Sequence, residues 1–142
     1  MDEINKKYLL EEFGYMHPVF EKLDYYDEKL VTALVSLRRS IMPGKTEQAG
    51  VLSTKVKELI VTAIEVALGR GEKGKSHARK AVRAGAEPRE VFEAVSLCIY
   101  LAGMTSWVDG GMDAVRAAED EYEKMRRGEE FRWTAEVSKG KE

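Results

Sequence analysis

The sequence predicts an all-α protein of about six helices. Apolar residues recur at helical spacing along almost the whole chain, whereas alternating β-branched runs are few and only three prolines occur in 142 residues. With 44% hydrophobic and 34% charged residues, the composition is that of a folded domain rather than a disordered chain. A chain of this length is expected to bury about 70% of its unfolded surface around one core.

Charge and hydropathy exclude several classes of protein. Lys and Arg number 23 against 25 Asp and Glu, so no basic patch is expected for nucleic acid or for an anionic membrane. Apolar runs are interrupted well short of the roughly 20 residues that cross a bilayer. Residues 1–7 are polar where a secretory signal would be apolar, so a cytoplasmic protein is expected.

Residues 1–50 are predicted to form an N-terminal helical extension packed on the core. The stripe of a first short helix comprises Tyr8, Leu9, Phe13 and Met16. The residue before a proline avoids the helical conformation, so His17 marks a boundary. Asp24 and Asp27 suit the first turn of the next helix, which Pro43 and Gly44 end. The apolar stripe of that helix comprises Leu30, Leu34, Leu37 and Ile41.

A further helix is expected after Ser53 or Thr54, either of which can cap it. Its apolar stripe comprises Val56, Leu59, Ile60, Ala63, Ile64, Ala67 and Leu68. At about 100° per residue, Glu58 and Glu65 fall on the opposite side of this helix. Carboxylates on such a polar face are more often solvated than catalytic.

A glycine-rich turn at residues 69–74 and a short helix from about Lys75 to Ala84 come next. His77 lies on the alanine-rich side of that helix, where a hydrogen-bonded core histidine is commoner than a catalytic one. The glycines are similar to those of a phosphate-binding loop, but the Walker order is absent and no strand precedes them. Nucleotide binding is therefore not expected here.

The last two predicted helices are strongly apolar. Pro88 suits the first position of a helix that is apolar nearly all round, which predicts a buried central helix. The stripe of the final helix comprises Val108, Met112, Val115, Ala118, Tyr122 and Met125. This stripe exceeds what one small domain can cover and predicts self-association. The charged tail, residues 128–142, contains Phe131 and Trp133, which are candidates for docking.

The candidate site residues cluster around the glycine-rich connection and include a proton-transfer group: Glu58, Arg70, Glu72, Lys73 and His77. For the run 70–75, an exposed charged turn is the commoner explanation. The single cysteine excludes a disulfide framework, a cysteine zinc site and an intramolecular dithiol cycle. The two histidines are far apart in the sequence, so a metal site of mixed histidine and carboxylate ligands is possible but unsupported.

Six short segments keep a characteristic order and spacing: Lys57–Ile60, Ala67–Arg70, His77–Ala81, Ala84–Ala86, Glu90–Val91 and Ala102–Gly103. They resemble the core of the carboxymuconolactone decarboxylase and alkylhydroperoxidase D family over roughly residues 51–122. The resemblance implies a two-layer helical core at residues 51–127. It also implies a symmetric homotrimer or homohexamer with a site near a subunit boundary.

The thiol peroxidase branch of this family has a glutamate, a C-x-x-C pair twelve positions later, and a histidine four positions after the second cysteine. The resemblance matches that glutamate to Glu58 and that histidine to His77, but Arg70 and Lys73 stand at the two cysteine positions. A dithiol cycle needs an attacking and a resolving thiol, so peroxidase activity is not expected. Cys98 lies in the most apolar helix and is expected to be an inert packing residue.

The decarboxylase branch resembles this chain in having an arginine after Leu-Gly and a histidine seven positions later, as Arg70 and His77 do. The resemblance implies a cofactor-free lyase acting on a small carboxylated lactone or a related acid. Arg70 would bind the substrate carboxylate, and Lys73 at the edge of the site, or Lys75, would offset charge developing on the carbonyl oxygen. His77 would transfer the proton, and Glu58 would orient His77. The alternative is a non-catalytic binding or assembly protein that keeps the fold. An enzyme would gather Glu58, Arg70 and His77 in one pocket, whereas a scaffold would leave Arg70 and Lys73 in solvent.

Overall fold

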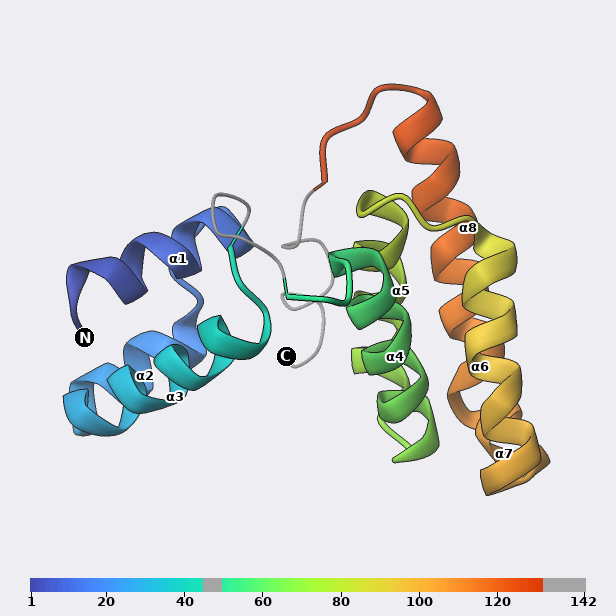
Figure 1. Cartoon of the computed structure of the whole chain (residues 1–142), viewed down its shortest axis with the longest axis horizontal. Helices are drawn as coiled ribbons and strands as arrows, with labels where there is room; N and C mark the ends of the chain where they lie inside the picture. The colour runs from blue at the N-terminus through green and yellow to red at the C-terminus, as the bar shows by residue number, and fades with distance from the viewer. Residues whose placement is uncertain (45–49, 132–142) are drawn as a thin grey trace, which may run out of the picture. The chain divides into compact units, whose positions relative to one another are not determined.

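The computed structural model describes residues 1–44 and 50–131 (Figure 1). All regular structure in these residues is helical, which confirms the predicted all-α class. The elements are α1 (Glu3–Phe13), α2 (Pro18–Tyr26), α3 (Glu28–Ile41), α4 (Thr54–Ala67), α5 (Gly71–Arg83), α6 (Pro88–Ala102), α7 (Met104–Ser106), the π-helical turn η1 (Trp107–Gly111) and α8 (Met112–Arg126). The described residues divide into two compact units, one within Met1–Gly50 and the other Val51–Phe131.

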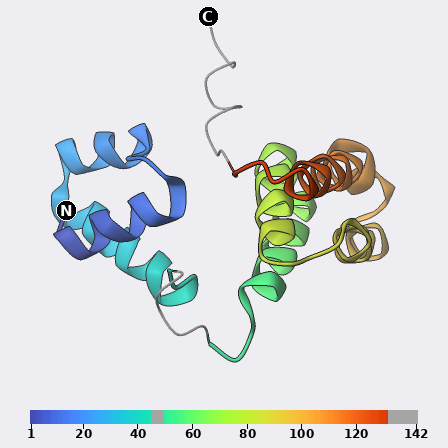
Figure 2. The ribbon, with the colours of Figure 1, turned by 90° about the horizontal axis from the view of Figure 1, so that it is seen from above.

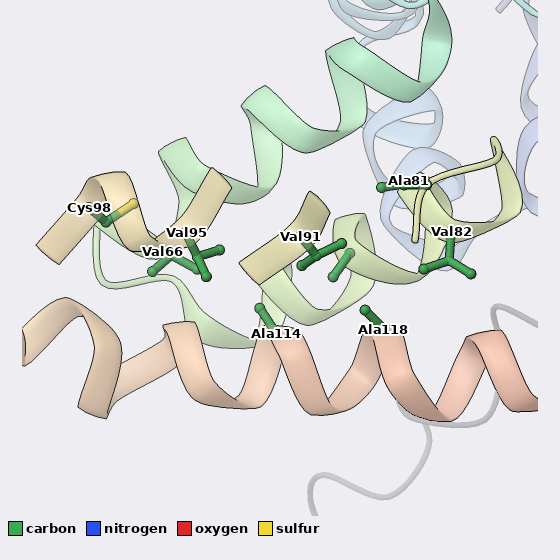
Figure 3. Packing of buried hydrophobic residues seen from close by; sticks show 10 residues of the cluster. Val66, Ala81, Val82, Val91, Val95, Cys98, Ala114 and Ala118 are labelled. Atoms are coloured by element: carbon green, nitrogen blue, oxygen red, sulfur yellow. The ribbon is translucent and has the colours of Figure 1, made fainter. Parts of the chain in front are cut away.

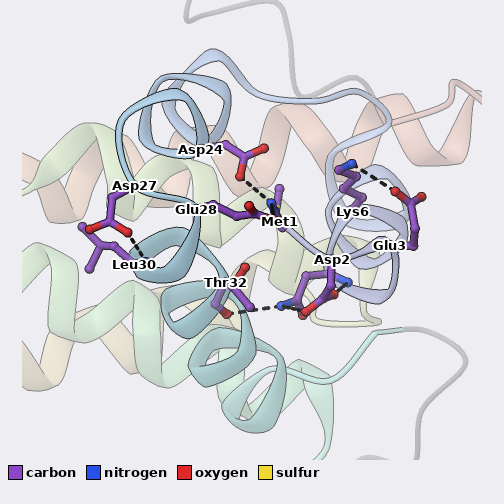
Figure 4. Close-up of polar contacts among 10 residues, drawn as sticks. Met1, Asp2, Glu3, Lys6, Asp24, Asp27, Glu28, Leu30 and Thr32 are labelled. Atoms are coloured by element: carbon purple, nitrogen blue, oxygen red, sulfur yellow. Dashed lines mark hydrogen bonds and ion pairs between the residues drawn. The ribbon is translucent and has the colours of Figure 1, made fainter.

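The first unit is held by a small apolar core and by buried polar contacts. Its core comprises Met1, Tyr8, Leu9, Val31 and Val35. The buried Asn5 amide donates hydrogen bonds to the Thr32 carbonyl oxygen at 3.2 Å and to Ser36 Oγ at 3.0 Å, which ties α1 to α3. Figure 4 shows the Asp27 carboxylate, which accepts from the Leu30 backbone N–H at 2.9 Å. Asp27 therefore caps α3. Asp24, which was predicted in the same first turn, lies instead within α2, a helix that the sequence pattern did not separate from α3.

The apolar stripe predicted for α3 does not face the core of this unit. Val31 and Val35 are fully buried, whereas the predicted stripe of leucines and Ile41 is largely exposed. The helical periodicity was correct, but α3 has two apolar faces. Only the narrower face packs against α1 and α2, because the branched valines lie where these helices meet α3.

The second unit is built around small side chains. Its core comprises Val66, Ala78, Ala81, Val82, Ala86, Val91, Val95, Cys98, Ala114 and Ala118 (Figure 3). Such short side chains allow helices to approach closely, and α5 packs between α4 and α8. The Lys55 ammonium lies 2.8 Å from a Glu90 carboxylate oxygen, and the Cys98 thiol donates to the Ala63 carbonyl oxygen at 3.2 Å. These two contacts hold α4 beside α6, and the two helices run parallel to each other.

Two predictions about burial in this unit were wrong. α6 was expected to be buried all round, but Leu97, Tyr100 and Leu101 are exposed on its outer side. On α4, Ile60 and Ile64 are also exposed. The apolar pattern alone marked both helices as buried, whereas the small unit covers only one face of each.

The predicted final helix is divided by a π-helical turn. After Gly103 the chain forms α7, η1 and α8 in succession. Figure 1 shows α7 at one end of the second unit and α8 running back along it, and Figure 2 shows the same helices from above. Ala118 is buried in the core, and Val115, Tyr122 and Met125 pack against it. The unit therefore covers much of this stripe itself, which removes the reason given for expecting self-association through it. Phe131 stacks with the Arg83 guanidinium at 5.8 Å, and Trp133 lies outside the described residues.

α5 begins at Gly71, four residues earlier than the sequence predicts. A Cβ atom on Gly71 would lie 2.8 Å from the Asp109 carbonyl oxygen and 3.3 Å from the Gly110 Cα. A Cβ atom on Gly74 would lie 2.9 Å from Val66 Cγ2. These glycines therefore serve close helix packing at the start of α5 and do not form the predicted turn.

Replacing Gly71 with alanine is expected to lower the free energy of unfolding by about 1–3 kcal/mol, the usual cost of overpacking a tight contact. The reason is that the new methyl group would meet the backbone at Asp109, which cannot rotate away. Urea denaturation followed by circular dichroism measures this loss. Glu72→Ala, at an exposed position in the same turn, is the matched control and should stay within about 0.5 kcal/mol of the wild type. Equal stability of Gly71→Ala and the wild type would contradict the packing explanation.

Candidate functional site

The central feature of the candidate site is a carboxylate and an imidazole in direct contact. The Glu58 side chain on α4 places its Oε2 atom 2.7 Å from Nδ1 of His77 on α5. Glu58 is only 3% exposed, although the sequence pattern favours a solvated position. The His77 side chain is 16% exposed, so one end of the pair is buried and the other reaches the surface.

Local sequence explains how the two side chains meet. Ser53 caps α4 by accepting from the Val56 backbone N–H at 3.3 Å, as predicted. At the other end, Gly69 takes a positive φ of 73°, which reverses the chain into α5. The lack of a side chain on Gly74 brings α5 against Val66, and the antiparallel helix pair then places His77 opposite Glu58.

This geometry fixes the hydrogen-bonding roles of the imidazole. Against an ionised Glu58 carboxylate, Nδ1 is the ring nitrogen that donates, which leaves Nε2 as the nitrogen that can face a substrate. Within residues 1–44 and 50–131, Nε2 has no hydrogen-bond partner. A carboxylate that orients a histidine in this way is a common arrangement for general acid and base catalysis.

The two cations predicted for the site, Arg70 and Lys73, lie at different distances from His77 along α5. Lys73 is one helical turn before His77, about 6 Å along the axis, and on the same face of the helix. Arg70 lies at the N-cap, seven residues before His77, and its side chain is 62% exposed. One of its guanidinium nitrogens lies 3.7 Å from a Glu65 carboxylate oxygen. In the described part of the chain, Arg70 makes no hydrogen bond or ion pair with Glu58 or His77.

Glu65 contacts the predicted site residue Arg70, and the sequence pattern did not predict this contact. Its carboxylate is largely buried, and the nearest cation is Arg70. Its backbone carbonyl oxygen also accepts from the Arg70 N–H at 2.8 Å. A signal was present, since Glu58 and Glu65 are seven residues apart and so share one face of α4.

The Cys98 thiol is a packing group in this structure. It is buried in the core and donates to the Ala63 carbonyl oxygen. Burial raises the pKa of the Cys98 thiol above its ordinary value. At neutral pH less of it is therefore thiolate than in the unfolded chain, and thiolate is the reactive form.

We expect Cys98 to react with a chromogenic disulfide reagent at least about tenfold more slowly in the folded protein than in denaturant. The increase in the reagent's absorbance, followed at about pH 7–8, slightly below the ordinary thiol pKa, measures both rates. Because burial raises the pKa, the folded rate should increase toward alkaline pH. Fast labelling under native conditions would show that the thiol is accessible and would contradict the packing role.

Other classes of site find little support in the described residues. Within them, no three side chains of His, Cys, Asp or Glu come together in a way that could hold a metal ion. None of their helices is both long and apolar enough to cross a membrane.

Comparison with known proteins identifies what the chain is similar to. Residues 29–120 match the model of the carboxymuconolactone decarboxylase family. A crystal structure described as a "putative carboxymuconolactone decarboxylase" from Burkholderia xenovorans LB400 shares 24% sequence identity and a TM-score of 0.74. The alignment covers 91% of this chain and 98% of that chain, which shows a common fold. No curated protein sequence gave a significant match. The family match begins in α3, within the segment predicted to be an N-terminal extension.

Proposed function

Because the chain belongs to the carboxymuconolactone decarboxylase family, we propose that it is a cofactor-free lyase that decarboxylates a small carboxylated lactone or a related acid. The observation that carries this proposal is the contact between Glu58 and His77. It supplies an oriented proton-transfer group with one ring nitrogen left for the substrate.

The reaction requires one bond to break and one proton to move. Cleavage of the bond to the carboxylate releases CO2 and leaves its electron pair on carbon, from which it delocalises onto the lactone carbonyl oxygen as a dienolate. Protonated His77 then donates its Nε2 proton to carbon, and solvent restores that proton. Glu58 stabilises the charged imidazole during this transfer because its carboxylate lies against Nδ1.

Lys73 is the better placed of the two cations for binding the substrate carboxylate. It is one turn from His77, and no hydrogen bond or ion pair occupies it in the described residues. Arg70 is farther along the helix and already faces Glu65. This ordering differs from the sequence-based prediction, which gave the carboxylate to Arg70.

Lys73→Ala is expected to raise KM by roughly 10–100-fold with a smaller change in kcat, because a charge-assisted hydrogen bond contributes about 1.5–3 kcal/mol. Lys75→Ala is the matched control. Lys75 lies two residues farther along α5 and pairs with Glu72 at 3.3 Å, so its loss should leave KM unchanged. Equal effects of the two substitutions would indicate a general loss of positive charge rather than a binding contact.

Purified protein should be tested for CO2 release from a panel of carboxylated butenolides and β-keto acids. Turnover above the uncatalysed rate, in the presence of a metal chelator, is the expected result. If no member of the panel is decarboxylated but some bind in calorimetry, the lyase proposal is wrong and a binding protein is favoured.

A non-catalytic binding or assembly protein is the second candidate. The observation in its favour is the exposure of both Arg70 and Lys73, since a scaffold is expected to leave these two side chains in solvent. The buried carboxylate of Glu58 favours the enzyme, because a purely structural position would more economically hold an apolar side chain.

A further inference from the structure

A second carboxylate, that of Glu65, lies on the same face of α4 as Glu58. The two residues are seven positions apart, which is about 10 Å along the helix axis. The Glu65 side chain is 17% exposed, and its Oε2 atom is buried and accepts no hydrogen bond within residues 1–44 and 50–131. A buried carboxylate oxygen without a donor is costly, so the nearest positive charge decides how this residue is balanced.

Arg70 supplies that charge and is held beside Glu65. Its backbone N–H donates to the Glu65 carbonyl oxygen at 2.8 Å, which fixes the start of the side chain next to α4. One guanidinium nitrogen lies 3.7 Å from Glu65 Oε2, which is an ion-pair distance but too long for a hydrogen bond. Moving the guanidinium to a bound anion would leave Glu65 buried without a counter-charge. Glu65 therefore makes Arg70 less available to a substrate.

Two further carboxylates around the start of α5 also have partners. The Glu58 carboxylate lies 2.7 Å from Nδ1 of His77. Nζ of Lys75 lies 3.3 Å from a Glu72 carboxylate oxygen. Each of these carboxylates therefore balances a group that could otherwise attract an anion.

Lys73 is the exception among these charges. Of the three Lys and Arg residues at positions 70–77, it alone forms no ion pair with the described part of the chain. Its side chain is exposed and lies one turn before His77. Asp109 of η1 meets α5 through its backbone carbonyl at Gly71, and in the same described residues no ion pair joins its carboxylate to Lys73. The site beside His77 therefore presents one uncompensated positive charge.

We propose that Glu65 is a specificity-determining residue that makes the site select acids with a single carboxylate. Because it retains Arg70, only Lys73 remains to bind an anion. A second carboxylate on the substrate would lose its hydration without gaining a partner, and the charge of Glu65 would repel it. This inference rests on the proposed function and deepens it by naming the charge of the substrate.

Calorimetry on the full chain with two inert probes tests this selectivity. The probes are a saturated γ-lactone with one carboxylate and a saturated γ-lactone with two carboxylates. Saturation removes the double bond through which the electron pair would delocalise, so binding is measured without turnover. The wild type is expected to bind the monocarboxylate at least about tenfold more tightly than the dicarboxylate, because the second carboxylate is desolvated without a partner.

Glu65→Gln keeps the size of the side chain and removes the charge that retains Arg70. The released guanidinium should raise the affinity for the dicarboxylate at least about tenfold, as one charge-assisted hydrogen bond does, and that for the monocarboxylate by less than about threefold. Combining Glu65→Gln with Arg70→Gln should restore the wild-type ratio of the two affinities. Glu72→Gln, which releases Lys75 in the first turn of α5, is the matched control and should leave that ratio unchanged.

The wild-type preference tests the proposal even if circular dichroism shows that a variant does not fold. A wild type that binds both probes equally, or binds neither, would overturn the proposal. An unchanged ratio in a folded Glu65→Gln variant, or an equal change in Glu72→Gln, would also overturn it.

The lyase proposal can fail separately from this one. Selective binding of the monocarboxylate with no CO2 release from any acid would support the charge selectivity and contradict only the reaction. Equal CO2 release from monocarboxylic and dicarboxylic substrates would support the reaction and overturn the role assigned to Glu65.

Discussion

Replacing His77 with alanine is expected to lower kcat for decarboxylation by roughly 10²–10⁴-fold, the usual contribution of a general acid or base. The imidazole is the proton-transfer group of this site, because Nδ1 contacts Glu58 and Nε2 remains available to a substrate. Without it, the dienolate must take its proton from water that is not oriented. The measurement is initial-rate CO2 release under saturating substrate.

The matched control for this prediction is Ser76→Ala. Ser76 precedes His77 on α5, and its hydroxyl donates to the Glu72 carbonyl oxygen within the same helix. Its loss should leave kcat within about twofold of the wild type, since exposed helix substitutions change little. If His77→Ala retains wild-type turnover on every accepted substrate while remaining folded, His77 is not the proton donor and the binding-protein reading is favoured.

The helical periodicity of the sequence was enough to predict the fold class, and polar residues at helix starts predicted the capping of two helices. The family was predicted from a resemblance of short motifs and not from periodicity. Asp27 and Ser53 cap α3 and α4 because their side chains accept from backbone N–H groups that a helix cannot pair internally. These are local interactions, and a single sequence contains them. The number of helices was less predictable, since η1 interrupts an apolar pattern that is typical of one continuous helix after Gly103.

Which face of each helix is buried depends on neighbours that no single helix reveals. α4 has an apolar stripe on one side and a second face that carries Glu58 and Thr62. The face with Glu58 and Thr62 is the one that α5 covers. The partner helix α5 has small residues on its facing side, which lets it approach α4 closely, and His77 on α5 satisfies the Glu58 carboxylate there. The larger apolar residues, such as Ile64, are left outside.

Dependence on neighbouring helices also explains why the positions of Glu58 and His77 were predicted correctly and that of Arg70 was not. The resemblance paired Glu58 with His77 through a family pattern, and the structure places them in contact. It gave no information on where α5 begins. That start depends on the approach of Gly71 to Gly110 in η1, a contact between segments almost forty residues apart, and it moves Arg70 to the boundary of the helix.

Glu58→Gln is expected to lower kcat by on the order of 10²-fold while KM changes little. The glutamine amide has the same size, but it can donate as well as accept, so Nδ1 of His77 no longer has a fixed role as donor. Nitrogen NMR of the imidazole should show the proton on Nδ1 in the wild type and a mixture of tautomers in the variant. A residue that only supports packing would leave both the tautomer and kcat unchanged.

Stability measurements separate this positioning role from a structural one. Removing a buried charge while keeping the side-chain volume should alter the free energy of unfolding little, because the lost ion pair and the relieved desolvation oppose each other. Glu58→Asp keeps the carboxylate on a shorter stem and should recover part of the lost kcat. If Glu58→Gln and Glu58→Asp lose activity equally and both unfold more easily, Glu58 holds the helices together and does not orient His77. A stable Glu58→Gln variant with a low kcat, partly rescued by Glu58→Asp, would instead mean that the carboxylate acts through the imidazole.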